Sequence, residues 1–290
     1  MKKSVSDGRY RRTVERIPQG ILDERTAAST FELTRHEPAE PLRLFVQYYW
    51  IVRWDLRGRQ AHRQRVLPNL SVHVSFSRSA SGVWGPGRDV FSYLLDGRDQ
   101  VLGVRFHPGC FRSFAGRPAE ERALPLADVF GPQAVETEAA VLAATGTAEM
   151  VRLTDELLGK DVPELDAAGA QARDAVRLIA GDPGLTRVGA LACATGLSVR
   201  TLQRLFADQV GVSPKWAIRV YRLSDAARRI ADDPALGHAR LASELGYSDQ
   251  AHFVRDFTAV VGTSPARYAH TQTGKRWPSR QTGRPPPSIQ

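Results

Sequence analysis

The chain has 290 residues, a length at which two domains are expected. Its formal net charge of +9 and its isoelectric point of about 10.0 favour anionic partners such as nucleic acid. No apolar run approaches the length of a membrane span, and the charged N-terminus lacks the apolar segment of an export signal. The two cysteines, Cys110 and Cys193, give neither a metal-ligand spacing nor a disulfide framework. We therefore expect a cytoplasmic protein with no membrane partner and no metal or other cofactor.

Both ends of the chain are basic and contain little that could build a core. Residues 1–28 and 271–290 are therefore predicted to be disordered. Their positive charges can add sequence-independent affinity for DNA, although solvated tails without a role would have the same composition. These charges are Lys2, Lys3, Arg9, Arg11 and Arg12 at the start and Lys275, Arg276, Arg280 and Arg284 at the end.

Residues 29–125 are predicted to form a β-rich domain. The runs LFVQYYWIVRW, LSVHVSFS, VFSYLL and VLGVRF are rich in β-branched and aromatic residues and are separated by Gly, Pro, Asn and Asp. In the second run Val72, Val74 and Phe76 alternate with polar residues, which predicts a half-buried strand with one polar face. The polar residues are Ser71, His73, Ser75 and Ser77. Several such strands predict a small β-sandwich or barrel.

Residues 126–160 are predicted to be mainly helical and to act as a helical linker. Gly131 and Pro132 mark a helix start, and apolar residues follow in a stripe. The stripe comprises Val135, Leu142, Val151, Leu153, Leu157 and Leu158. We expect it to pack against the sandwich or against a second subunit. Residues 159–169 are then expected to connect the two domains.

An internal repeat occupies the C-terminal third of the chain. The copies cover 191–214 and 241–265; both begin with Leu-Ala, contain a Gly five residues later and close on Gly-x-Ser-Pro. A repeat of this kind is typical of one supersecondary unit built twice. Each copy reads as helix, Gly-containing turn and helix, the helix-turn-helix arrangement that places a second helix in the major groove of DNA. The repeat therefore predicts DNA binding.

Each copy is expected to bury one face of its second helix. In the first copy Gly196 ends a helix and Ser198 caps the next; in the second, Gly246 makes the turn and Ser248 caps. Apolar residues at i, i+3 and i+4 are predicted to point inward. They are Leu202, Leu205 and Phe206 in the first copy and Phe253, Phe257 and Val260 in the second. Cys193, on the first helix, is predicted to be a small core residue.

The outward faces of the two second helices provide the candidate DNA-binding residues. They are Arg200, Thr201, Gln203 and Arg204 in the first copy and Ala251, His252, Val254 and Arg255 in the second. A helix that faces only water could carry similar side chains. The doubled unit favours contact with DNA over this alternative.

The two copies differ in what they can read. Arg200 and Arg204 can hydrogen-bond guanine, and Gln203 can pair with adenine. The second copy has small apolar side chains at two equivalent positions, which can touch a thymine methyl group but cannot donate or accept a hydrogen bond. We therefore expect the first copy to carry most base discrimination, with Arg255 as the main polar reader in the second. His252 is expected to reach a phosphate or to pack locally.

The C-terminal third resembles the AraC/XylS family of bacterial transcription regulators. The resemblance is carried by LSVRTLQRLFADQVGVSPKWAIRVYRL and by LGYSDQAHFVRDFTAVVGTSPARY, with the run Gly-Tyr-Ser-Asp-Gln-Ala-His-Phe at 246–253 close to the family signature. It covers 172–270 and implies a seven-helix DNA-binding domain in which one long helix joins two helix-turn-helix units. That helix is expected over 214–231, with Pro at its first position after a Ser cap.

The resemblance extends more loosely to the N-terminal half. In this family the N-terminal domain is often a cupin-like jelly roll that receives a small effector. Tyr-Tyr-Trp at 48–50, Val-Leu-Pro-Asn at 66–69 and Gly-Val-Arg-Phe-His-Pro-Gly at 103–109 resemble one such sensor class. This chain departs from the pattern in one turn, because Asn69 and Leu70 stand where relatives often have Asp-Gly.

Three alternatives to a regulator have weaker support in the sequence. A cupin-like metalloenzyme could use His62, His73 and His107, but these form no close His-x-His pair. A DNA-repair protein with a helical domain of this type would need a reactive Cys in a Pro-Cys-His setting, whereas Cys110 lies in Pro-Gly-Cys-Phe. An architectural DNA-binding protein would not need the β-rich half.

We therefore expect an α+β protein with an N-terminal β-sandwich or jelly-roll-like sensor domain, a helical linker and a C-terminal all-α domain with two helix-turn-helix units. Its expected function is sequence-specific DNA-binding transcription regulation controlled by a small effector, without enzymatic activity. The expected partners are double-stranded promoter DNA, RNA polymerase, the effector and a second copy of the chain.

Overall fold

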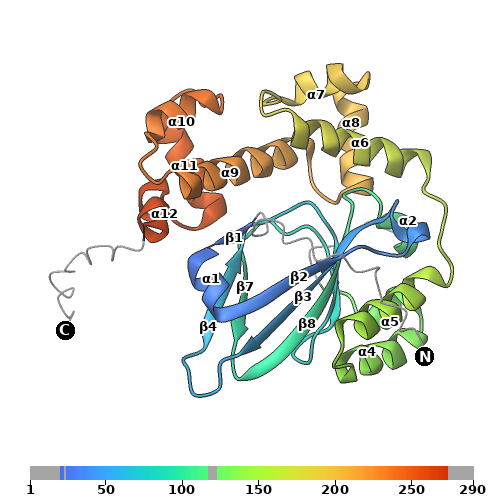
Figure 1. Ribbon diagram of the computed structural model, residues 1–290. Coiled ribbons are helices and arrows are strands. Elements are labelled where there is room, and N and C mark those ends of the chain that lie inside the picture. The colour runs from blue at the N-terminus through green and yellow to red at the C-terminus, as the bar shows by residue number, and fades with distance from the viewer. Residues whose placement is uncertain (1–19, 23, 117–122, 274–290) are drawn as a thin grey trace, which may run out of the picture.

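The computed structural model describes residues 20–22, 24–116 and 123–273, which form two domains (Figure 1). The N-terminal domain combines two β-sheets with short helices. The C-terminal domain consists of helices that lie above one end of the sheets in Figure 1. The fold class is α+β, as the sequence predicts.

Two antiparallel sheets form the frame of the N-terminal domain. The larger sheet has the strand order β2 (Phe31–His36), β3 (Val46–Asp55), β8 (Arg98–Phe106), β5 (His73–Phe76) and β6 (Gly82–Trp84). The smaller sheet has the order β1 (Ile21–Leu22), β4 (His62–Val66) and β7 (Phe91–Leu95). Trp50 of β3 is paired with Gly103 of β8, and its ring occupies the space in which a Gly103 side chain would lie. Glycine is needed there because a neighbouring side chain crosses the strand.

Helices cover one face of the larger sheet. They are α3 (Leu126–Phe130), α4 (Gln133–Ala143) and α5 (Thr147–Gly159), with η1 (Glu40–Leu42) and α2 (Arg112–Ala115) at the edge. The Tyr49 hydroxyl donates to Asp155 Oδ1 at 2.6 Å, and Arg53 Nη1 donates to Thr147 Oγ1 at 2.8 Å. A shared apolar core fills the space between helices and sheet. Residues 126–160 therefore complete the N-terminal domain and are not a separate linker.

The predicted apolar stripe of this helical region was wrong at its first position. Val135 is 58% exposed. The residues of α4 that enter the core are Ala134 and Val141, which lie two helical turns apart on the face toward the sheet. The buried face of α4 therefore includes Ala134 and not the predicted Val135, because contact with the sheet decides which face of the helix is buried.

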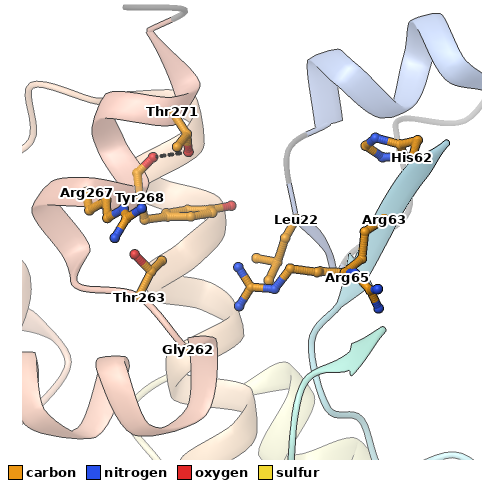
Figure 2. A pocket seen from close by; sticks show the side chains of 9 residues that line it. All are labelled: Leu22, His62, Arg63, Arg65, Gly262, Thr263, Arg267, Tyr268 and Thr271. Carbon is orange, nitrogen blue, oxygen red and sulfur yellow. Dashed lines mark hydrogen bonds between the residues drawn. The ribbon is translucent and has the colours of Figure 1, made fainter. Parts of the chain in front are cut away.

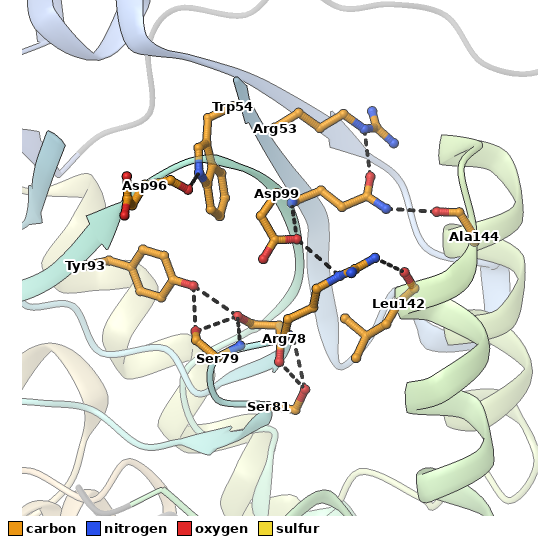
Figure 3. Close-up of polar contacts among 12 residues, drawn as sticks. Arg53, Trp54, Arg78, Ser79, Ser81, Tyr93, Asp96, Asp99, Leu142 and Ala144 are labelled. Atoms are coloured by element: carbon orange, nitrogen blue, oxygen red, sulfur yellow. Dashed lines mark hydrogen bonds and ion pairs between the residues drawn. The ribbon is translucent and has the colours of Figure 1, made fainter. Parts of the chain in front are cut away.

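The other face of the larger sheet meets the smaller sheet. Trp54 packs edge-on against Tyr93 of β7, with ring centroids 6.1 Å apart. The Tyr93 hydroxyl lies 3.0 Å from Ser77 Oγ and 2.7 Å from Ser79 Oγ (Figure 3). Aromatic rings and hydroxyl groups therefore share the space between the sheets.

The strand predicted over 71–77 forms as β5, but its polar face is not exposed to solvent. Val72, Val74 and Phe76 enter the core beneath the helices, as predicted. Ser75 and Ser77, which point the opposite way, are also buried because that face lies between the two sheets. The alternation of polar and apolar residues was identified correctly, and the half-buried environment inferred from it was wrong.

The disorder predicted for 1–28 is contradicted over its last part. Residues Ile21–Leu22 form β1, which pairs with β4, and residues Glu24–Thr30 form α1. Leu22 is buried in a core that also includes side chains of the C-terminal domain. This long-range packing gives no local sequence signal. The disorder predicted for 271–290 is likewise contradicted at its start, because residues 271 and 272 belong to a helix. The remaining parts of the predicted tails, 1–19 and 274–290, lie outside the described residues.

In the described part of the chain, the C-terminal domain has the seven helices that the resemblance implies. They are α6 (Ala167–Gly181), α7 (Val188–Thr195), α8 (Val199–Gln209), α9 (Pro214–Asp232), α10 (His238–Glu244), α11 (Gln250–Val261) and α12 (Pro265–Gln272). The first begins at Ala167, five residues before the expected domain start, because Asp166 caps it by accepting the Gly169 backbone N–H at 2.6 Å. The connecting segment is therefore 160–166, shorter than the expected 159–169.

The long helix α9 follows the prediction closely. Ser213 is its N-cap and Pro214 its first residue. Ala217 and Ile218 belong to the core of the first helix-turn-helix unit, and Leu223 belongs to the core of the second. One helix thus contributes buried side chains to both cores. None of the helices in the described ranges is long and apolar enough to cross a membrane.

Candidate nucleic-acid interface

The first helix-turn-helix unit forms as the sequence predicts. Helix α7 ends at Gly196, which has a φ of 68°, a left-handed conformation that favours glycine. Ser198 then caps α8, and its side chain accepts the Thr201 backbone N–H at 3.1 Å. Leu202, Leu205 and Phe206 are buried in the core of the unit. This packing leaves the opposite face of α8 toward solvent.

The second unit has a different cap from the predicted one. Gly246 makes the turn with a φ of 73°, but the N-cap of α11 is Asp249, whose Oδ1 accepts the His252 backbone N–H at 2.7 Å. This hydrogen bond holds the pKa of Asp249 below its ordinary value. Ser248, the predicted cap, instead donates from its hydroxyl to Asp249 Oδ2 at 3.1 Å. The second turn is one residue longer than the first, and the cap moves with it.

The candidate DNA-binding residues share one solvent-facing side on each unit. Arg200, Gln203, Arg204, Ala251, His252 and Arg255 are exposed, and Thr201 and Val254 are half-buried. Phe253, Phe257 and Val260 are buried behind the second set, as predicted. Within the described residues, the side chains of Arg200 and Arg204 make no hydrogen bond or ion pair. These two guanidinium groups are available to an external acceptor.

Two of the eight candidate side chains are engaged locally. The Thr201 hydroxyl lies 2.8 Å from Ser198 Oγ and so takes part in the cap. The His252 ring packs edge-on against Tyr247, with ring centroids 5.2 Å apart, and its Nδ1 lies 3.4 Å from Ser248 Oγ. Both side chains therefore support the start of a helix.

A network that fixes the second unit on α9 was missed at the sequence level. The Tyr247 hydroxyl donates to Asp256 Oδ2 at 3.0 Å, and Arg219 of α9 pairs with Asp256 Oδ1 at 2.7 Å. The Arg222 guanidinium lies over the Tyr247 ring, 4.1 Å from its centroid. Burial raises the pKa of Tyr247 above its ordinary value, so its hydroxyl stays protonated and can donate. The sequence signal that could have pointed to this network is the place of Tyr247 in the signature run at 246–253.

A cleft of about 320 Å³ lies between the smaller sheet and the end of the second unit (Figure 2). Arg65 of β4 extends across it toward Gly262, and its Nη2 donates to the Val261 carbonyl at 2.9 Å. The cleft is lined by Leu22, His62, Arg63, Arg65, Gly262, Thr263, Arg267, Tyr268 and Thr271. The N-terminal domain therefore touches the C-terminal end of α11 through a charged side chain.

The residues considered for enzymatic alternatives are not arranged for such chemistry. No group of three or more His, Cys, Asp or Glu within the described ranges could hold a metal ion. His73 is half-buried, and desolvation together with Arg105 lowers its pKa to about 3. Burial raises the pKa of the Cys110 thiol to about 11, which disfavours the nucleophilic thiolate. Cys193, predicted to be a core residue, is exposed because α7 turns Leu191 and Ala192 inward instead.

Two known families match the chain. Residues 34–123 match the family described as "Domain of unknown function (DUF6597)", and residues 191–271 match the family described as "Helix-turn-helix domain". The first match spans strands of both sheets, and the second begins in α7 and ends in α12.

Solved structures with some likeness include three bacterial proteins. One is a transcriptional regulator with an AraC-type DNA-binding domain from Chromobacterium violaceum, which is 20% identical over 36% of this chain and 92% of that chain, with a TM-score of 0.33. Another is the C-terminal domain of the response regulator AraT from Geobacillus stearothermophilus, which is 23% identical over 40% of this chain and 94% of that chain, with a TM-score of 0.34. The third is ToxT from Vibrio cholerae bound to an unsaturated fatty acid, which is 11% identical over 88% of this chain and 95% of that chain, with a TM-score of 0.37. All three TM-scores are below 0.5.

The doubled unit, its capped second helices and the match over 191–271 define a DNA-binding protein of the helix-turn-helix class. More narrowly, the C-terminal domain is an AraC-type helix-turn-helix DNA-binding domain, and it follows an N-terminal domain that matches DUF6597.

The cap at Asp249 generates a first prediction. Asp249→Ala should lower the urea midpoint of unfolding, because the first backbone N–H groups of α11 lose their acceptor. Ser248→Ala should lower it clearly less, since that hydroxyl only supports Asp249. The measurement is urea unfolding of both variants at neutral pH, where Asp249 is ionised. An equal loss in the two variants would return the capping role to Ser248.

Proposed function

We propose that this protein is a transcription regulator that reads specific double-stranded promoter sequences with α8 and α11 and is controlled by a small effector bound in the N-terminal domain. The observation that carries the proposal is the pair of capped helices whose outward faces carry the candidate residues. The N-terminal halves of recognition helices contact base edges in the major groove. Arg200 and Arg204 are assigned to guanine, and Gln203 to adenine.

The two reader helices are proposed to contribute unequally. The exposed face of α8 carries hydrogen-bonding side chains, whereas α11 offers Ala251 and Val254 at the equivalent positions of its outward face. Arg255 is then the main polar reader of α11. The contacts of His252 with Tyr247 and Ser248 support a local role for that side chain.

The effector site is proposed to lie between the two sheets. Aromatic and hydroxyl side chains of both sheets meet there, and small-molecule sites use groups of these kinds. Trp84 Nε1 donates to Ser75 Oγ at 2.8 Å, and Trp50 Nε1 donates to His73 Nδ1 at 3.3 Å. Among the described residues, the buried Ser71 hydroxyl has no hydrogen-bond partner. A ligand with a flat apolar part and a few polar groups suits these side chains.

The remaining partners complete the proposal. A second copy of the chain would suit paired DNA sites, RNA polymerase would receive the regulatory output, and the cytoplasm is the compartment in which promoter DNA is available. Sedimentation of the full chain with and without DNA tests the second copy. Genome-wide mapping of its binding sites would direct the search for an effector, since regulators often bind beside the genes that handle their effector.

Replacing Arg204 tests base reading by α8. Arg204→Ala should cost ~1–3 kcal/mol of binding to the specific site and relax one base position. The measurement is titration of specific and random duplexes at one fixed salt concentration, because the phosphate contribution depends strongly on salt. An equal loss on both duplexes would make Arg204 a phosphate contact.

The asymmetry of the readers is tested by site selection. DNA selected from a random library by the full chain should show more sequence information in the part contacted by α8 than in the part contacted by α11. Hydrogen-bonded contacts discriminate between bases more strongly than contact with a methyl group does. Equal information in the two parts would contradict the proposed ordering.

Removing the N-terminal domain tests where the effector acts. A fragment covering 166–273 retains the Asp166 cap and both reader helices. It should bind the same sites as the full chain, more weakly if the N-terminal domain holds a dimer together. An effector should change the affinity of the full chain and leave the fragment unaffected, with both measured at the same salt concentration. A response retained by the fragment would place the sensor in the helices.

A further inference from the structure

Each helix-turn-helix unit rests on its own part of the N-terminal domain. The loop between β4 and β5 supplies two buried leucines three residues apart. Leu67, 5% exposed, belongs to the core of the second unit, and Leu70, 2% exposed, belongs to the core of the first. The loop therefore bridges the two units independently of α9.

A charged contact accompanies the bridge at the second unit. Arg65 Nη2 donates to the carbonyl of Val261, the last residue of reader helix α11. Gly262 follows with a φ of 75°, and a side chain there would come within 2.6 Å of Arg65 Nη2. Arg65 is half-buried on β4, whose pairing with β1 and β7 fixes its backbone.

An equivalent contact occurs at the first unit. Arg112 Nη1 donates at 3.2 Å to the carbonyl of Asp208, in the last turn of reader helix α8. Arg112 begins α2, directly after Phe111, which is buried in the N-terminal core against Phe106 with ring centroids 4.9 Å apart. Nearby, Gly109 approaches α6 so closely that a side chain there would come within 2.9 Å of Ala172 Cβ.

Each of the two arginines thus donates a hydrogen bond to a carbonyl at the C-terminal end of a reader helix. The last carbonyls of a helix have no partner within the helix, and a cation is favourable at that end. The base-reading side chains lie in the opposite halves of α8 and α11, so the arginines hold the readers without covering their reading faces.

We infer that Arg65 and Arg112 are positioning residues for DNA recognition. Through them and the Leu67–Leu70 bridge, the N-terminal domain fixes the distance and angle between α8 and α11 and so selects the spacing between the two DNA segments that these helices read. The inference rests on the proposed function in one respect, namely that both helices read DNA.

Spacing is a sensitive readout of this geometry. One added base pair moves a DNA segment by about 3.4 Å along the axis and rotates it by about 34°. Burial of α9 in both cores limits how far the two units can turn, and we expect the small motions that remain to let the units accept neighbouring spacings. With both ends held by the N-terminal domain, they should accept one.

The experiment uses the full chain and duplexes in which the two selected segments are separated by the selected spacing or by one base pair more or less. The spacing preference is measured as the ratio of the Kd for a duplex with a neighbouring spacing to the Kd for the duplex with the selected spacing. This ratio should be about tenfold for the wild type and less than about threefold for R65A/R112A. Arg65→Lys, which keeps a cation and a donor, should retain part of the preference. Arg63→Ala is the matched control, because Arg63 lies on the same strand but contacts Ser92 of its own domain.

Urea unfolding and binding to a duplex with only the α8 segment show whether the variants are folded and can still read. A folded double variant with unchanged spacing preference would overturn the inference, as would an equal loss in Arg63→Ala. A wild-type chain without any spacing preference would overturn it too. Failure of wild type to bind selected DNA more tightly than random DNA would instead contradict the proposed function.

Discussion

The arrangement of the DNA-binding domain depends on the burial of one helix in two separate cores. Ala217 and Ile218, near the start of α9, are buried with the first helix-turn-helix unit, and Leu223 and Ile230 are buried with the second. Because a helix is rigid over this length, neither unit can turn far without exposing apolar surface of its own core. The outward direction of both reader helices follows from this constraint.

The N-terminal domain adds a second connection of a different kind. Its contacts with the helices combine buried leucines with arginines that reach the ends of α8 and α11. These surface contacts are noncovalent, and along the chain the two domains are joined through residues 160–166. The DNA-binding domain is therefore held from within by the burial of α9 and from outside by contacts with the N-terminal domain.

The bridging loop is also connected to the space between the sheets. Asn69 Oδ1 accepts the Ser71 backbone N–H at 2.9 Å and lies 3.2 Å from His73 Nε2. The other ring nitrogen of His73 accepts from Trp50, and burial together with Arg105 keeps the pKa of His73 low enough for a neutral ring. A continuous series of hydrogen bonds thus leads from an inter-sheet tryptophan to the turn that carries Leu70. Asn69 makes this connection.

The sequence by itself determined the features that depend on local spacing. The repeat, the turns at Gly196 and Gly246, the buried stripes of both reader helices and the start of α9 at Pro214 were all predictable, because capping and helical periodicity act within a few residues. Only the tertiary structure decided that the polar side of β5 is buried, that Val135 is exposed and that Leu22 is ordered. It also decided the roles of Arg65 and Arg112, whose acceptors lie 196 and 96 residues further along the chain. Each arginine reaches its helix end only because the two domains pack together, and a local sequence pattern does not predict which residues such packing brings into contact.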